Sequence, residues 1–321
     1  MTWLVTGGAG YIGSHVVAAL LDAGMDTVVV DDLSTGREAF IPSGARFVQG
    51  DILNGSLLLD TFERFDVSGV VHIAGFKYAG VSVDRPLHTY EQNVTAMAVL
   101  LGVMQEKRVE RIVFSSSAAV YGTPDVDLVT ETTPASPESP YGETKLIGEW
   151  LLRDLARATT LAHTSLRYFN VVGSGLDGVF DVSPHNLFPL VFEALLNGET
   201  PRINGGDYPT PDGTCVRDYV HVADIALAHV AAARRLEAGE TIEPAYNLGS
   251  GNGVSVAEIM AAIAGVTGIE FTPTVAQRRT GDPARIVASG VLATRDLGWT
   301  MRHSLIEMVE SAWRARQQPS S

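Results

Sequence analysis

The chain has 321 residues, of which 45% are hydrophobic and 32 are glycines, and it carries a formal net charge of −14. This length and composition predict one large α/β domain or two unequal lobes, and they exclude an intrinsically disordered protein. The negative charge repels nucleic acid and anionic membranes, so we expect neither as a partner.

The reactive side chains also exclude several classes of site. Cys215 is the single cysteine, which rules out an intrachain disulfide and a cysteine-built metal centre. The eight histidines show no metal-ligand spacing, so we expect no metal. No stretch has the apolar length of a membrane span, and the chain enters a strand-like run at its start without the features of a signal peptide. We therefore expect a cytoplasmic protein.

Short apolar runs alternate with longer segments of helical periodicity in the first half of the chain. The predicted strands are Trp3–Thr6, Thr27–Val30, Arg46–Val48, Val70–Ile73, Ile112–Phe114 and Ser165–Tyr168. The predicted helices are Ser14–Ala23, Leu87–Glu106 and Gly142–Arg157. Strands and helices that alternate in this way predict an α/β fold with a doubly wound parallel Rossmann sheet.

The composition of the chain changes after about Asn170, where a stretch rich in glycine and proline begins that we expect to form many loops. It predicts a smaller α+β lobe that lies over the carboxyl edge of the sheet. We therefore divide the chain into residues 1–172 and residues 173–321. Residues 217–249, which look like a further strand and helix, are expected to return to the first domain.

A glycine-rich turn follows the first predicted strand, with Gly7, Gly10 and Gly13 at a three-residue period before a helix. Such a turn brings backbone close to a pyrophosphate at the positive end of the helix. Asp31 ends the second strand, where its carboxylate can accept hydrogen bonds from the two hydroxyls of an adenosine ribose. Asp32 adds a second carboxylate that would repel a 2′-phosphate. Together these residues predict a dinucleotide site for NAD rather than NADP.

Tyr141 and Lys145 stand four residues apart at the start of a predicted helix, and therefore on one face of it. We expect the ammonium group to lower the pKa of the phenol and so make Tyr141 an acid/base. Ser117 ends the fifth predicted strand, at the edge where doubly wound folds bind ligands. Its hydroxyl is expected to help Tyr141 to hold a substrate oxygen.

Several longer motifs resemble those of the UDP-glucose (UDP-galactose) 4-epimerases, in the extended short-chain dehydrogenase/reductase family. The motifs are Gly7 to Ser14, His72-Ile-Ala-Gly-Phe-Lys77, Phe114-Ser-Ser-Ser117, Tyr121-Gly122, Ser139-Pro-Tyr-Gly142, Lys145, Leu166-Arg-Tyr-Phe-Asn170, Asp207 to His221, Tyr246-Asn-Leu-Gly249 and Arg278-Arg-Thr-Gly-Asp282. The resemblance covers nearly the whole chain. It implies inversion of C4 of a UDP-hexose through a transient 4-keto sugar, with residues 1–172 holding NAD, residues 173–321 holding the UDP-sugar, and a homodimer as the assembly.

The resemblance also implies a role for particular residues. The catalytic residues would be Ser117, Tyr141 and Lys145. The NAD-binding residues would be Gly7, Gly10, Tyr11, Ile12, Gly13, Asp31, Asp32, Asp51, Ile52, Ile73, Ala74, Lys77, Asn93, Tyr141 and Lys145. The substrate-binding residues would be Ser117, Phe169, Asn170, Asn186, Leu187, Arg217, Arg279, Asp282 and Ile286. Among these, Arg217 and Arg279 would clamp the diphosphate in an otherwise acidic protein, and Asp282 would bind the uridine ribose.

Three positions depart from the family pattern and leave the sugar open. Asn204 stands where an aromatic ring usually faces uracil, Ala119 replaces a threonine, and Ile286 occupies a position that gates hexose size. An epimerase for a UDP-N-acetylhexosamine or a UDP-uronate stays open. A sugar-nucleotide 4,6-dehydratase is disfavoured because no acid and base pair follows Ser117. A protein that senses NAD without chemistry is disfavoured because Tyr141 and Lys145 are both kept.

Overall fold

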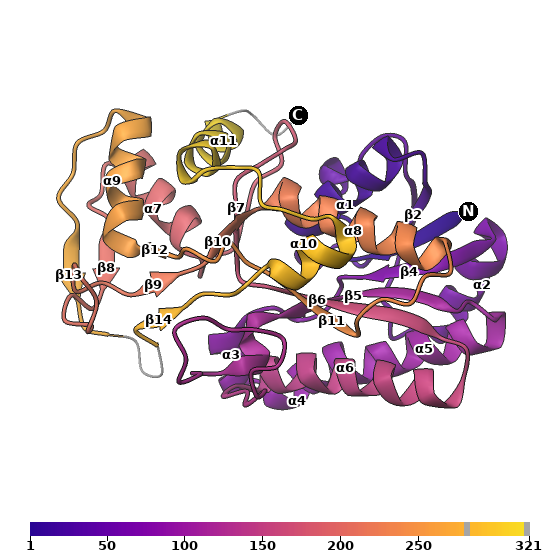
Figure 1. Ribbon diagram of the computed structural model, residues 1–321. Helices are drawn as coiled ribbons and strands as arrows, with labels where there is room; N and C mark the ends of the chain where they lie inside the picture. The colour runs from indigo at the N-terminus through magenta and orange to yellow at the C-terminus, as the bar shows by residue number, and fades with distance from the viewer. Residues whose placement is uncertain (279–282, 318–321) are drawn as a thin grey trace.

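The computed structural model describes residues 1–278 and 283–317. Its centre is a parallel sheet of seven strands in the order β11-β6-β5-β4-β1-β2-β3 (Figure 1). The strands are β1 (Thr2–Thr6), β2 (Asp26–Asp31), β3 (Arg46–Gln49), β4 (Val67–His72), β5 (Arg111–Ser117), β6 (Ala162–Tyr168) and β11 (Ala245–Leu248). The strand order reverses between β1 and β4, which opens a crevice at the carboxyl ends of the strands. The predicted doubly wound α/β fold is confirmed.

Helices cover both faces of this sheet, and each face has its own core. On one face lie α2 (Gly55–Phe65), α5 (Ala96–Lys107) and α6 (Pro140–Ala158). On the other lie α1 (Tyr11–Asp22), α8 (Val222–Glu237) and α10 (Val291–Leu297). In β1, Trp3 and Val5 belong to one core and Leu4 to the other, because successive side chains of a strand point to opposite faces. Burial on both faces explains why the strands read as continuous apolar runs.

The predicted helix Leu87–Glu106 is divided into three pieces. They are α4 (Pro86–Tyr90), a π-helical turn η2 (Glu91–Thr95) and α5, preceded by the short α3 (Ala79–Asp84). A π turn places one extra residue in the helix and changes the direction of the side chains that follow. Asn93 lies in this turn and is 7% exposed, so the turn buries an amide that sequence periodicity alone does not single out.

The second lobe has a core of its own, built mainly from three helices (Figure 1). They are α7 (Leu187–Leu196), α9 (Val256–Thr267) and α11 (Leu305–Gln317). The short strands of this region are β7 (Asn170–Val172), β8 (Arg202–Asn204), β9 (Val216–Arg217), β10 (Tyr219–His221), β12 (Val254–Ser255), β13 (Thr274–Ala276) and β14 (Arg285–Ile286). Two 3₁₀ turns, η1 (Glu38–Phe40) and η3 (Ala118–Tyr121), complete the elements.

The segment expected to return to the first domain, residues 217–249, contains α8 and β11. The helix packs on α1, and β11 pairs in parallel with β6. The exact division into residues 1–172 and 173–321 stays a prediction. Within residues 1–278 and 283–317, no helix combines the length and the apolar character needed to cross a bilayer.

Candidate functional site

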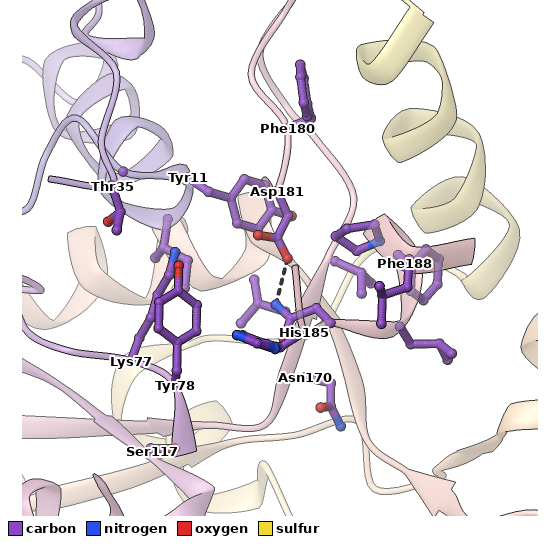
Figure 2. A pocket seen from close by; sticks show the side chains of 18 of the residues that line it. Tyr11, Thr35, Lys77, Tyr78, Ser117, Asn170, Phe180, Asp181, His185 and Phe188 are labelled. Carbon is purple, nitrogen blue, oxygen red and sulfur yellow. Dashed lines mark hydrogen bonds between the residues drawn. The ribbon is translucent and has the colours of Figure 1, made fainter. Parts of the chain in front are cut away.

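One cavity of about 1170 Å³ lies where the loops after the central strands meet the second lobe. Most of the predicted site residues line it, and Figure 2 shows this cavity from close by. The predicted residues that line it are Gly7, Gly10, Tyr11, Ile12, Gly13, Asp31, Asp32, Asp51, Ile52, Ile73, Ala74, Lys77, Ser117, Tyr141, Lys145, Phe169, Asn170, Asn186, Leu187 and Arg217. The fold therefore brings residues from far apart in the sequence to one site.

The glycine-rich turn forms one end of the cavity. Gly7 has a φ of +74°, and a Cβ there would lie 2.7 Å from the backbone nitrogen of Ala74. A Cβ on Gly13 would overlap the Gly7 carbonyl, so this glycine lets the helix pack on the turn. A Cβ on Gly10 would meet only the Gly7 carbonyl oxygen, at 3.3 Å, and Gly10 lines the cavity. The turn thus exposes backbone to the cavity at the start of α1.

Asp31 lies at the carboxyl end of β2 and is 8% exposed. Its Oδ2 accepts a hydrogen bond from the Ala9 backbone nitrogen at 2.9 Å, and its Oδ1 accepts one from the Leu33 nitrogen at 2.9 Å. Burial raises the pKa of this carboxyl group, while these hydrogen bonds lower it. The two backbone bonds fix the orientation of the carboxylate toward the cavity, and its remaining lone pairs can accept from ligand hydroxyls.

The other end of the cavity holds Ser117, Tyr141 and Lys145. Ser139 caps the start of α6 by accepting a hydrogen bond from the Gly142 nitrogen, and Pro140 stands at its first position. This start places Tyr141 one turn before Lys145. The Lys145 Nζ donates to the Ser115 carbonyl oxygen at 2.9 Å. Three groups from β5 and α6 therefore converge on the cavity.

The expected effect of Lys145 on Tyr141 is wrong in this geometry. Burial raises the pKa of the Tyr141 phenol, and the group that lowers it is the Ser117 hydroxyl, through a hydrogen bond. The Lys145 Nζ lies 5.8 Å from the centroid of the Tyr141 ring and is occupied by the Ser115 carbonyl. Burial also lowers the pKa of Lys145 to about 8. Ser117, rather than the ammonium group, is the direct partner of the phenol.

Most of the predicted substrate residues line the cavity, as Ser117 does. Phe169, Asn170, Asn186, Leu187 and Arg217 line the cavity. The Asn170 amide nitrogen donates to the Asp218 carbonyl oxygen at 3.2 Å, which holds its side chain at the start of β7. Arg279 and Asp282 lie outside the described residues.

Asn93 and Ile286 are not among the residues that line this cavity, and their roles stay predictions. The Asn93 amide accepts from the Phe76 nitrogen at 2.6 Å and donates to Thr144 Oγ1 at 2.8 Å, so it holds the wall in place. Ile286 pairs in register with Arg217, and its side chain packs against the apolar cluster that also contacts Phe169.

Sequence reasoning missed several residues that line the same cavity. Tyr78 follows Lys77 in a motif that was recognised, so this motif was an available signal. Phe180, Asp181 and His185 lie in an irregular segment without periodicity, so no pattern marked them. In residues 1–278 and 283–317, no group of three or more His, Cys, Asp or Glu side chains is arranged to hold a metal ion.

Comparison with known proteins agrees with this geometry. The family model described as NAD dependent epimerase/dehydratase matches residues 3–249. This chain belongs to that family. A UDP-glucose 4-epimerase of Corynebacterium glutamicum is 43% identical over 98% of this chain and 95% of its own length. One of Lacticaseibacillus casei is 42% identical over 98% of this chain and 96% of its own length.

Solved structures of UDP-glucose 4-epimerases have the same fold as this member of the epimerase/dehydratase family. A crystal structure of a UDP-glucose 4-epimerase superposes with a TM-score of 0.95 at 44% identity, covering 99% of this chain and 98% of the other. The Bifidobacterium longum UDP-glucose 4-epimerase, solved with NAD⁺ and UDP, has a TM-score of 0.90 at 36% identity, with 98% of each chain covered.

The residues present fit the cofactor in the family name. At Gly10 the turn offers backbone to the cavity, where a side chain would fill the space that a pyrophosphate needs. Asp31 supplies a buried, oriented carboxylate at the same end. From there the cavity reaches Tyr141 and Lys145. One cavity therefore joins the features of an adenosine site to an acid/base site.

Proposed function

We propose that this protein interconverts UDP-galactose and UDP-glucose by inverting C4 of the hexose with NAD as cofactor. The observation that carries the proposal is that Ser117, Tyr141 and Lys145 share one cavity with the glycine-rich turn, Asp31 and Arg217. A redox group, an acid/base group and a cation for a diphosphate are the parts that such a reaction needs. The UDP-glucose 4-epimerases that match nearly the whole chain support the choice of substrate.

The Rossmann end of the cavity holds the cofactor. The turn at Gly7, Gly10 and Gly13 would receive the pyrophosphate, and Asp31 the adenosine ribose. Lys145, which lines the cavity, would bind the nicotinamide ribose. When bound, NAD supplies the oxidant for C4 and a positive charge that favours the ionised form of a nearby phenol.

Tyr141 moves the proton of the reaction. As phenolate, Tyr141 removes the proton from the C4 hydroxyl while C4 is oxidised to a ketone. As phenol, it returns this proton after the keto sugar has rotated in the site to present its other face. The Ser117 hydroxyl, which lowers the pKa of Tyr141, stabilises the phenolate and orients the sugar oxygen.

Arg217 is proposed to hold the diphosphate. We expect Arg217→Ala to raise KM by roughly 10–100-fold with a much smaller change in kcat, because charge-assisted hydrogen bonds of this kind contribute about 1.5–3 kcal/mol. Steady-state kinetics with UDP-galactose measures this. Arg234→Ala, at an arginine of α8 that is not among the residues lining the cavity, is the control and should keep the wild-type KM. A lower kcat at an unchanged KM would contradict the assignment.

The function itself is tested without added cofactor. Purified protein is incubated with UDP-galactose, UDP-N-acetylgalactosamine and UDP-galacturonate in parallel, and the products are separated by chromatography. We expect UDP-galactose to be converted to UDP-glucose by NAD that stays bound through purification, since the cycle is redox-neutral. Heat-released cofactor should react with an NAD-specific enzyme. Absence of hexose interconversion, or release of NADP, would contradict the proposal.

Ile286 is proposed to influence the size of the hexose pocket through Phe169. Both side chains pack against the cluster of Val120, Tyr121, Val129, Leu146 and Ala288, and Phe169 lines the cavity. A tyrosine at 286 would push Phe169 inward. We expect Ile286→Tyr to lower kcat/KM for the N-acetylated pair relative to the UDP-glucose pair by up to about 10–200-fold, with Ile286→Ser moving the ratio the other way. An unchanged ratio in both variants would remove Ile286 from the pocket.

We further propose a homodimer that acts in the cytoplasm. The exposed helix faces near residues 90–106 and 143–157 would form the interface, and Trp150 on α6 is 47% exposed there. Light scattering tests this interface. We expect the mass of a dimer for wild type and the mass of a monomer for Trp150→Glu. The lone Cys215, which allows no intrachain disulfide, favours a reducing compartment.

A further inference from the structure

An irregular segment of the second lobe, residues 174–186, forms part of the cavity wall between β7 and α7. Phe180 lies between the guanidinium groups of Arg37 and Arg316, which are 5.5 Å and 5.2 Å from its ring centroid. Asp181 Oδ2 accepts a hydrogen bond from the Asn186 amide at 2.6 Å, drawn as the dashed line in Figure 2. Cation-π contacts therefore hold the middle of the segment, and the hydrogen bond between Asn186 and Asp181 braces it internally.

Near its carboxyl end this segment contacts the first domain through two aromatic rings. The imidazole of His185 and the phenol ring of Tyr78 approach edge to face, with centroids 5.0 Å apart and planes at 72°. Figure 2 shows the two rings close together beside Lys77. Both residues line the cavity, and they come from opposite lobes.

The Tyr78 ring is itself supported from behind. Phe76 contacts it edge to face at 5.5 Å, and the backbone of Phe76 is bonded on both sides by the buried amide of Asn93. The second ring of the contact, that of His185, is supported through its backbone. The His185 backbone nitrogen donates to Ser183 Oγ at 3.3 Å, and Ser183 is 2% exposed. A contact between two supported rings can hold the two lobes together over the cavity.

We infer that the contact between Tyr78 and His185 is an interlobe latch that keeps segment 174–186 over the cavity while the sugar is a ketone. This inference rests on the proposed function. The 4-keto sugar must turn inside the site before it is reduced again, so it is held weakly at the hexose. If the ketone leaves, its hydride stays on the cofactor and its hydroxyl proton stays on Tyr141, and the enzyme is left reduced and inactive. Tyr78 and His185 are thus positioning residues.

The experiment compares Tyr78→Ala and His185→Ala with wild type, and uses Tyr78→Phe as the matched control because it keeps the ring. An aromatic edge contact changes an opening equilibrium by roughly 2–10-fold. We therefore expect amide hydrogen exchange in residues 174–186 to become about 2–10-fold faster in each alanine variant. During turnover with UDP-galactose, the fraction of enzyme left reduced, read from the absorbance of reduced nicotinamide, should rise by a similar factor.

Tyr78→Phe should match wild type in both measurements. The double alanine variant should show the same exchange rate and reduced fraction as the single variants, because each single change already removes the same contact. Unchanged exchange and unchanged reduced fraction in the alanine variants would overturn the latch, and so would an effect of Tyr78→Ala that His185→Ala lacks. A wild-type protein that does not interconvert the sugars would instead overturn the proposed function, and the retention role with it, while the exchange measurement would still report on the contact.

Discussion

Replacing Tyr141 with phenylalanine is expected to lower kcat by about 10²–10⁴, the range for the loss of one general acid/base. The change removes only the phenol oxygen that accepts the C4 proton and bonds to Ser117. Contacts to the nucleotide are left in place, so UDP affinity should stay close to wild type. Turnover of UDP-galactose together with calorimetric titration of UDP measures both effects.

Tyr90→Phe is the matched control for this experiment. Tyr90, at the end of α4, donates a hydrogen bond to Glu143 on α6 at 2.5 Å, so it is a second tyrosine whose hydroxyl is hydrogen-bonded beside the helix that carries Tyr141. Tyr90 is not among the residues that line the cavity. Because Tyr90 belongs to α4 and lies outside the cavity lining, we expect Tyr90→Phe to turn over at close to the wild-type rate. Full activity of Tyr141→Phe would show that another group carries the proton.

Replacing Glu149 with alanine should lower the free energy of unfolding by about 3–5 kcal/mol, because it leaves a charge buried without its partner. Glu149 Oε1 accepts hydrogen bonds from Arg167 Nε at 2.8 Å and from Ser116 Oγ at 2.6 Å. The two charged side chains are each 10% exposed. Arg167 also donates to the Tyr121 hydroxyl at 2.8 Å, so the pair ties α6 to β6 and η3. Urea denaturation measures the shift in midpoint.

Two comparisons separate this buried pair from ordinary surface charge. Glu63→Ala breaks the ion pair with Lys107, in which the carboxylate side chain is 77% exposed, and should cost less than about 1 kcal/mol. The double variant Glu149→Met with Arg167→Met should be more stable than Glu149→Ala, because no lone charge is left behind. A loss in Glu149→Ala no larger than that in Glu63→Ala would contradict the role of the pair.

Local rules explain how much of the fold and site could be predicted from the sequence. The apolar runs of the central strands, the glycine turn at Gly7 and the cap before Tyr141 each depend on neighbours a few residues away. The resemblance added Phe169 and other lining residues by their place in motifs. These predictions needed no knowledge of long-range packing.

Burial and contacts between distant segments were decided only by the tertiary structure. The pKa of Tyr141 is raised because the folded chain covers the phenol, and Lys145 bonds to the Ser115 carbonyl instead of acting on the phenol. Asn93 is buried in a π turn, where its amide bonds to the Phe76 backbone and to Thr144. Tyr78 meets His185 only because the second lobe folds over the sheet. Desolvation and contacts of this kind depend on where remote residues come to lie, which no local pattern encodes.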